Sequence, residues 1–213
     1  MENRIYKIYA PKNKKVVLRV MKGHFATRNS HVNMYIDLTT MKTRLSEATE
    51  AARLIGKQYS KTTVVDTIIC LDGCEVIGAA LASYLSEAGS LTMNTHETIY
   101  IITPEYNTHG QMIFRDNIQP SVYGKHILLL VASATTGETI RKSIDCIHYY
   151  GGIVEGVNAI FSAVDEIDGR EVHSIFKKKD IPEYNSYKIS QCPICASKQK
   201  LDAMVDSYGY IKL

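Results

Sequence analysis

The stretch 126–140, HILLLVASATTGETI, joins an apolar run to a turn rich in hydroxyl groups. Residues 127–131 are continuously apolar, which is typical of a parallel strand whose two faces are both covered. Gly137 is the residue in the turn that is free to adopt an unusual backbone angle. From 138 to 149 the apolar residues recur at the spacing of a helix.

A phosphate could bind at this turn, because the first N–H groups and the dipole of a helix attract an anion. The hydroxyl groups would add donors, although the spacing of a Walker loop is absent. An ordinary strand-to-helix connection capped by Ser or Thr is the alternative. The candidate phosphate-binding residues are Ser133, Thr135, Thr136, Gly137, Glu138 and Thr139.

Composition and charge are those of a folded domain. The chain has 213 residues, of which 45% are hydrophobic and 22% charged, so it can bury a full core. A net charge of +3 is too small to indicate nucleic acid binding, and no apolar stretch is long enough to span a membrane. The odd number of cysteines, five, predicts reduced thiols in a cytoplasmic protein.

Helix-like and strand-like segments alternate between residues 42 and 164, which predicts an α/β fold with a parallel twisted sheet flanked by helices. We expect helices over 45–59, 75–87 (ending near Gly89) and 138–149, and strands over 63–71, 98–103, 127–131 and 153–161. Residues 1–40 are expected to form a cap, 41–180 the core, and 181–213 a tail that packs on the cap or on a dimer partner. The polar connection 104–125 predicts a functional loop or mobile lid.

In an open parallel sheet, ligands bind beyond the carboxyl ends of the strands. The loops 72–78, 104–124 and 133–139 all lie at such ends, so they should meet at one cleft.

The sequence resembles the type I phosphoribosyltransferases, and within them the orotate phosphoribosyltransferases. The family's central motif is a hydrophobic strand, two acidic residues, two further residues and Thr-Thr-Gly-x-Thr, which LLL (128–130) and TTGET (135–139) resemble. The segments GHF (23–25), YID (35–37), LDGCEVIG (71–78), GGIVEGV (151–157) and CPIC (192–195) also resemble family segments, in the same order.

This resemblance implies an α/β core with a small N-terminal hood and a C-terminal tail, in a homodimer. It implies transfer of ribose 5-phosphate from phosphoribosyl pyrophosphate to a nitrogenous base such as orotate, with release of pyrophosphate. Mg²⁺ is the cofactor that this reaction implies.

Two departures bear on catalysis. Val131 and Ala132 occupy the positions of the family's acidic pair, and neither side chain can accept a hydrogen bond from a ribose hydroxyl. The loop TPEYNTHG (103–110) keeps His109 and Gly110 but lacks the family's three basic residues. We therefore favour a divergent transferase in which other groups supply these charges. The alternative is a catalytically degenerate protein that binds a phosphorylated ribose or nucleotide.

Site residues follow from the matching segments. The loop after residue 71 would meet pyrophosphate or its magnesium, unless its polar residues only cap the next helix. Arg28 could pair with an acidic base such as orotate, although an exposed arginine is often only solvated. The candidates are Asp72, Glu75 and His109 for catalysis, Asp72, Gly73 and Cys74 for the pyrophosphate loop, and Phe25, Arg28 and Tyr35 for the base.

Cys192 and Cys195 have the spacing of two zinc ligands, but no second pair lies nearby in the sequence. We interpret them as structural thiols and predict no metal site here, with a site shared across a dimer as the alternative.

The phosphate turn can be tested by replacing Thr136 with leucine or Gly137 with valine. Either change should abolish binding of any 5′-phosphorylated ribose and leave the fold intact, as measured by calorimetric titration with phosphoribosyl pyrophosphate. Unchanged affinity in both variants would remove the assignment.

Overall fold

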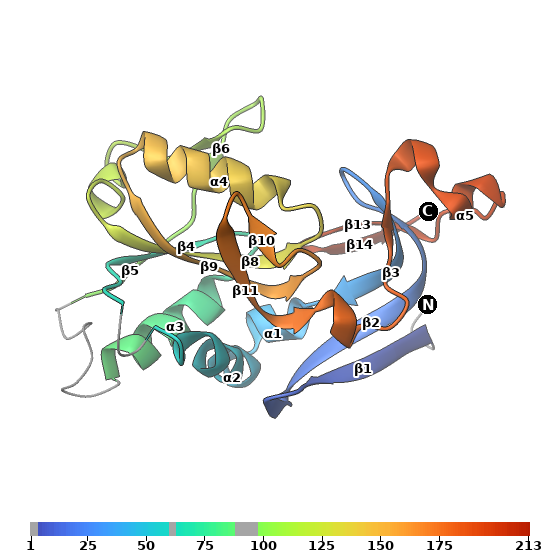
Figure 1. Ribbon diagram of the computed structural model, residues 1–213, viewed down its shortest axis with the longest axis horizontal. Coiled ribbons are helices and arrows are strands. Elements are labelled where there is room, and N and C mark those ends of the chain that lie inside the picture. The colour runs from blue at the N-terminus through green and yellow to red at the C-terminus, as the bar shows by residue number, and fades with distance from the viewer. Residues whose placement is uncertain (1–3, 60–62, 88–97) are drawn as a thin grey trace.

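The computed structural model describes residues 4–59, 63–87 and 98–213, and its main feature is a core sheet in the order β10-β11-β9-β8-β4-β5 (Figure 1). Neighbouring strands are parallel except β10 and β11, which are antiparallel. The strands are β4 (Thr67–Cys70), β5 (Tyr100–Ile102), β8 (His126–Ala134), β9 (Ile153–Ser162), β10 (Glu166–Ile167) and β11 (Arg170–Lys177). The predicted α/β fold with a largely parallel sheet is confirmed.

Strand β8 lies in the middle of this sheet and is covered on both faces. Helix α4 (Glu138–Tyr149) lies on one face, and α2 (Leu45–Gly56) and α3 (Glu75–Glu87) lie on the other (Figure 1). Leu128 and Leu130 pack in the hydrophobic cluster of α2 and α3, whereas Leu129 and Val131 pack in the cluster of α4. The continuous apolar run therefore follows from a strand with no solvent face.

The expected elements are present, with some different ends. Helices α3 and α4 begin at the expected residues, and α4 also ends at the expected residue. Strand β8 is longer than expected, while α2 and β4 are shorter. The helix end expected near Gly89 lies outside the described residues.

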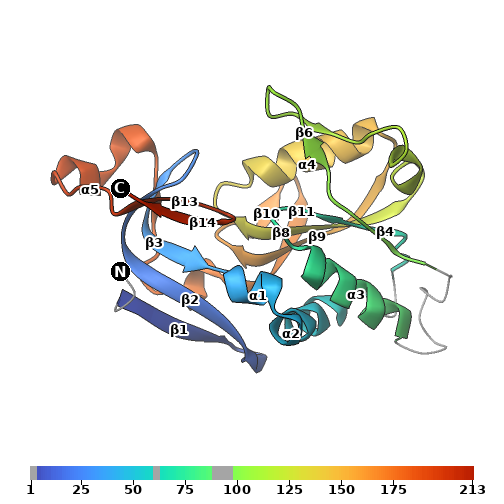
Figure 2. The same ribbon diagram turned by 180° about the vertical axis from the view of Figure 1, so that it is seen from behind.

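The N-terminal and C-terminal segments share a second sheet, here called the hood sheet, in the order β12-β3-β2-β13-β14 with β1 paired to β2. Strand β13 runs parallel to β2 and forms an antiparallel hairpin with β14. Figure 2 shows this hairpin leaving the hood and pointing toward the core sheet. The strands are β1 (Ile5–Ala10), β2 (Asn13–Ala26), β3 (His31–Asp37), β12 (Ser186–Tyr187), β13 (Ala203–Asp206) and β14 (Gly209–Lys212).

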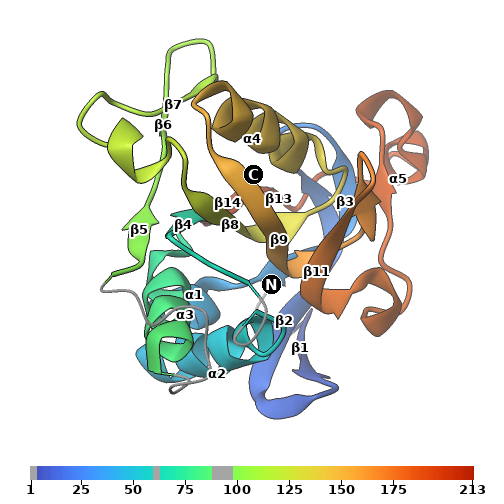
Figure 3. The same ribbon diagram turned by 60° about the vertical axis from the view of Figure 1, so that its left-hand side comes forward.

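The connection 104–125, expected to be a polar loop or mobile lid, contains an ordered hairpin. Strands β6 (Glu105–Tyr106) and β7 (Met112–Ile113) pair antiparallel, and the hairpin stands beside α4 (Figure 3). Asn107 closes its tip, because its side-chain oxygen accepts the backbone N–H groups of His109 and Gln111, each at 2.9 Å. Local polar side chains thus supply hydrogen bonds that the sequence pattern did not reveal.

The described part of the chain also contains two short α-helices, α1 (Thr39–Thr43) after the hood and α5 (Pro193–Ala196) in the tail. It has the 3-10 helices η2 (Gln119–Ser121), η3 (Lys178–Asp180) and η4 (Ile189–Gln191) as well. No helix within 4–59, 63–87 and 98–213 has the length and apolar character that a membrane span needs.

The buried position of β8 predicts the effect of a core substitution. Leu130→Ala should lower the free energy of unfolding by about 2–5 kcal/mol, because the side chain is 0% exposed and its loss leaves a cavity. Leu45→Ala is the matched control, since Leu45 is 68% exposed and should change stability by less than about 0.5 kcal/mol. Urea unfolding measures the free energy of unfolding of both variants. Equal losses of stability would contradict the buried position of β8.

Candidate functional site

The turn between β8 and α4 exposes hydroxyl groups beside an uncapped helix start. Gly137 is the N-cap residue with φ +81°, and no side chain in the described residues caps α4. Ser133, Thr136 and Thr139 are exposed around it. The first N–H groups of α4 and these hydroxyls could bind a phosphate oxygen.

The environment of Gly137 corrects one expectation about this turn. A Cβ atom at Gly137 would lie 2.6 Å from Cδ1 of Ile167, and the left-handed backbone would strain any L side chain. Gly137→Val would therefore disturb the fold, so it cannot report on phosphate binding alone. Thr136 is exposed, which leaves the change at that position as the informative one.

The loop after β4 carries the predicted pyrophosphate contacts in a left-handed backbone. Asp72 has φ +59° and Gly73 φ +76°. Cys74 is buried, and its N–H donates to the carbonyl of Leu71 at 3.2 Å. The thiol of Cys74 thus faces the core, which opposes a direct role in binding pyrophosphate.

Asp72 lies beside the end of β8. Burial raises the pKa of its carboxyl, although the Ser207 side chain, the charge of Lys42 and the backbone N–H of Ala132 all act in the opposite direction. Val131 and Ala132, at the positions of the family's acidic pair, are each 1% exposed. Because the N–H of Leu71 donates to the carbonyl of Leu130 at 2.8 Å, the next residue, Asp72, is placed beside this strand end.

Lys42 joins the hood, the core loop and the tail, and sequence reasoning missed it. Its Nζ donates to the backbone carbonyl of Asp72 at 2.7 Å and to that of Ser207, and it lies 5.6 Å from the centre of the Tyr208 ring. Lys42 is 6% exposed although it is charged. No local pattern in the sequence marks a lysine on a short helix as buried.

The hairpin β6–β7 also reaches this region. Burial raises the pKa of Tyr106, and the charge of Asp72 raises it further. A Cβ atom at Gly110 would lie 3.3 Å from a guanidinium nitrogen of Arg28. The structure thus brings the predicted base-binding Arg28 to the segment that carries His109, which is exposed.

Two other predicted site residues, Glu75 and Phe25, have surroundings that do not favour their predicted roles. Glu75 is exposed and accepts a hydrogen bond from the Thr103 hydroxyl at 2.8 Å. Phe25 is 0% exposed and packs against Tyr35, with ring centres 6.0 Å apart. The ring of Phe25 is part of the hood core, which opposes its predicted contact with a base.

Tyr35 and a loop cation also have specific surroundings. Tyr35 lines a hollow of about 300 Å³ within the hood, together with Asp37 and Tyr210. Arg115, the arginine of the 104–125 segment, is bound to Glu105 at 2.7 Å. Its charge is thus partly neutralised and is not directed at the phosphate turn.

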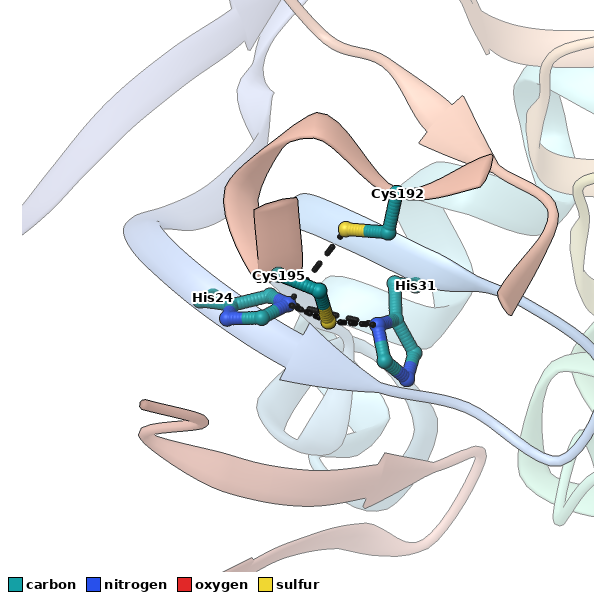
Figure 4. Close-up of side chains that lie close together, drawn as sticks. All are labelled: His24, His31, Cys192 and Cys195. Atoms are coloured by element: carbon teal, nitrogen blue, oxygen red, sulfur yellow. Dashed lines mark hydrogen bonds between the residues drawn. The ribbon is translucent and has the colours of Figure 1, made fainter. Parts of the chain in front are cut away.

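Four side chains with metal-binding atoms meet where the tail joins the hood (Figure 4). They are His24, His31, Cys192 and Cys195, whose ligand atoms all lie within 4.8 Å of one another. The interpretation of the cysteines as plain structural thiols assumed that no second pair was available. The fold supplies that pair from the two histidines, which are remote in sequence.

The core sheet, the helix start after β8 and the hood define a type I phosphoribosyltransferase fold. The structure of orotate phosphoribosyltransferase from Aeropyrum pernix aligns with a TM-score of 0.53 at 20% identity, over 77% of this chain and 90% of that one. The Mycobacterium tuberculosis enzyme in complex with 5-phospho-α-D-ribosyl 1-diphosphate aligns with a TM-score of 0.51 at 15% identity, over 69% of this chain and 82% of that one.

Sequence similarity narrows the class. The chain is 27% identical over 187 residues to orotate phosphoribosyltransferase of Chlorobium phaeobacteroides, which covers 86% of this chain and 88% of that protein. No family model matches the sequence. The sequence is therefore similar to orotate phosphoribosyltransferases at modest identity.

The raised pKa of Asp72 predicts how stability depends on pH. The folded state binds the Asp72 proton more tightly than the unfolded state, so ionisation of Asp72 destabilises the fold at neutral pH. Asp72→Asn should be more stable than the wild type at pH 7, and the difference should shrink as pH falls through the folded pKa toward the ordinary 3.8. Asparagine also tolerates the left-handed backbone at this position.

Urea unfolding between pH 3.5 and 7.5 measures this difference. Asp145→Asn, at an exposed position on α4, is the control and should stay within about 0.5 kcal/mol of the wild type. A difference for Asp72→Asn that grows as the pH falls would contradict the burial of Asp72.

Proposed function

We propose that the chain is a divergent phosphoribosyltransferase of the orotate type. It would transfer ribose 5-phosphate from phosphoribosyl pyrophosphate to a ring nitrogen of a base such as orotate. The observation that carries this proposal is the position of Asp72, which follows Leu71, whose N–H donates to the carbonyl of Leu130 at 2.8 Å directly before the positions of the missing acids. Asp72 would thus supply a negative charge at the end of β8, although Val131 and Ala132 of that strand are apolar.

The reaction breaks the bond between the anomeric carbon and the pyrophosphate oxygen, and forms a carbon–nitrogen bond. Pyrophosphate leaves with the electron pair of the broken bond, and the ring nitrogen gives up its proton. Positive charge develops on the ribose ring in between. A carboxylate beside the ring stabilises that charge, and a nearby cation stabilises the leaving pyrophosphate.

The described residues offer a group for each of these tasks. The start of α4, with Thr136 and Thr139, would bind the 5′-phosphate. Asp72 would face the developing positive charge. Lys42 has three N–H donors, of which two bind the carbonyls of Asp72 and Ser207, so the third could contact pyrophosphate.

Asp72 would be the carboxylate available to a magnesium ion at this loop, and the ion would supply positive charge that offsets part of the charge of pyrophosphate. Without the acidic pair, the chain offers fewer carboxylate oxygens near the ribose, so binding of phosphoribosyl pyrophosphate should depend only weakly on Mg²⁺. The homodimer that the resemblance implies and the cytoplasmic location that the cysteine content predicts remain predictions.

The alternative is a protein that binds a phosphorylated ribose or nucleotide without catalysis. The apolar residues at 131 and 132 favour it, since removal of a single stabilising group costs enzymes about 2.7–4 kcal/mol of barrier. The pairing of Arg115 with Glu105 also favours it, because that charge is already neutralised.

The test is calorimetric titration with phosphoribosyl pyrophosphate, with and without Mg²⁺, followed by addition of orotate and measurement of pyrophosphate release. We expect binding that depends little on Mg²⁺, and turnover of orotate. Asp72→Asn should lower kcat about 10²–10³-fold while the substrate still binds, because a group acting in the transition state is removed. Asp145→Asn should keep the wild-type kcat.

The outcomes separate the two functions. Binding without turnover of orotate or the other common bases would favour the binding protein. Absence of binding would contradict both functions and the phosphate turn. Wild-type kcat in Asp72→Asn would show that another group supplies the negative charge.

A further inference from the structure

Two histidines of the hood and two cysteines of the tail converge on one point. His24 is on β2, His31 begins β3, and Cys192 and Cys195 flank the Pro-Ile dipeptide of the tail (Figure 4). His24, His31 and Cys192 are buried, with at most 7% of each residue exposed. All four side chains are outside the proposed transferase machinery.

Four of the six distances between their ligand atoms are close to those of a tetrahedral zinc site. Zn–N bonds of 2.0–2.1 Å and Zn–S bonds of 2.3 Å place neighbouring nitrogens about 3.4 Å apart, and a nitrogen and a sulfur about 3.6 Å apart. In the structure, Nε2 of His24 lies 3.2 Å from Nδ1 of His31, and 3.5 Å from each cysteine sulfur. Sγ of Cys195 lies 3.3 Å from Nδ1 of His31.

The hydrogen bonding of His24 presents a lone pair to this point. Its Nδ1 lies 3.0 Å from the carbonyl oxygen of Gln199, which can only accept, so Nδ1 carries the proton. Nε2 of the neutral ring then has a free electron pair directed at the two sulfurs and His31. In a metal-binding histidine, the ring nitrogen that does not bind the metal usually donates its N–H to a carbonyl, a carboxylate or water.

The backbone around His24 is shaped to aim its side chain. The pairing of β2 with β3 shifts register between Lys22 and Phe25, so His24 lies in a bulge. A bulge re-aims a side chain, which here points to the same place as His31 across the hairpin. Gly23 is needed beside it, since a Cβ atom there would lie 2.6 Å from a carboxylate oxygen of Asp202.

The donor set selects the metal. Two imidazole nitrogens and two thiolates in a tetrahedron suit Zn²⁺, whereas Mg²⁺ and Ca²⁺ require oxygen ligands. A closed set of four protein ligands is typical of structural rather than catalytic zinc. Cys192 and Cys195 are free thiols, so both sulfurs are available.

We propose that His24, His31, Cys192 and Cys195 bind one structural Zn²⁺ ion that fastens the tail to the hood. The ion joins histidines of the hood to cysteines of the tail that are at least 161 positions away in the sequence, the separation of His31 and Cys192. It holds the segment that leads into β13 and β14, whose turn places Ser207 and Tyr208 at Lys42. This inference does not depend on the transferase activity.

The first test is the metal content of the full chain, expressed without a polyhistidine tag and purified under reducing conditions. We expect one zinc per chain, and less than a tenth of that in the Cys192→Ser/Cys195→Ser double variant. Cys146→Ser is the matched control and should retain one zinc, because the Cys146 thiol contacts the carbonyl of Met112 instead. Zinc well below one per wild-type chain, or equal loss in the control, would overturn the proposal.

A second test uses the wild-type chain, so it does not require a variant to fold. Chelation should remove the zinc and lower Tm, and one equivalent of Zn²⁺ should restore Tm whereas excess Mg²⁺ should not. One equivalent of Co²⁺ added to the metal-free chain should give the intense absorption of tetrahedral cobalt with thiolate ligands. A weak octahedral spectrum, or an unchanged Tm after complete removal of zinc, would contradict a closed structural site.

Discussion

The pairing of β8 with β4 on one side and β9 on the other is the constraint on which the rest of the structure depends. Because α2 and α3 cover one face of β8 and α4 covers the other, both clusters of the core pack against this strand. Helix α4 begins just after the carboxyl end of β8. Asp72 follows the carboxyl end of β4 at the same edge of the sheet. The phosphate turn and the carboxylate are neighbours because the strands are.

In the proposed function, the phosphate site and the charges for pyrophosphate transfer come from different kinds of groups. An anion site made of backbone N–H groups survives almost any change in nearby side chains, because the helix itself supplies it. The charges for pyrophosphate transfer depend on individual side chains. Here the strand end is apolar, and the charged groups proposed instead are Asp72 from the loop after β4 and Lys42 from α1.

The elements that were predicted correctly from the sequence are those with a local pattern. The apolar run of β8 and the helical period of α4 each involve neighbouring residues, and so does the glycine between them. Lys42, Tyr208 and the histidine pair were missed because their partners are more than a hundred residues away or across a bulge. Phe25 was assigned to the base from a matching segment, and a match in sequence does not tell which face of a strand is buried.

The contact between Lys42 and Ser207 joins residues 165 positions apart, which has a consequence for the order in which the molecule forms. Synthesis proceeds from the N-terminus at about 5–20 residues per second, so the ribosome adds Ser207 roughly 8–33 s after Lys42. During that interval the hood strand β2 has no β13 beside it, and the ammonium group of Lys42 lacks one carbonyl partner. The contact between Lys42 and the tail is therefore a late product of biosynthesis, which forms only after all strands of the core sheet have been synthesised.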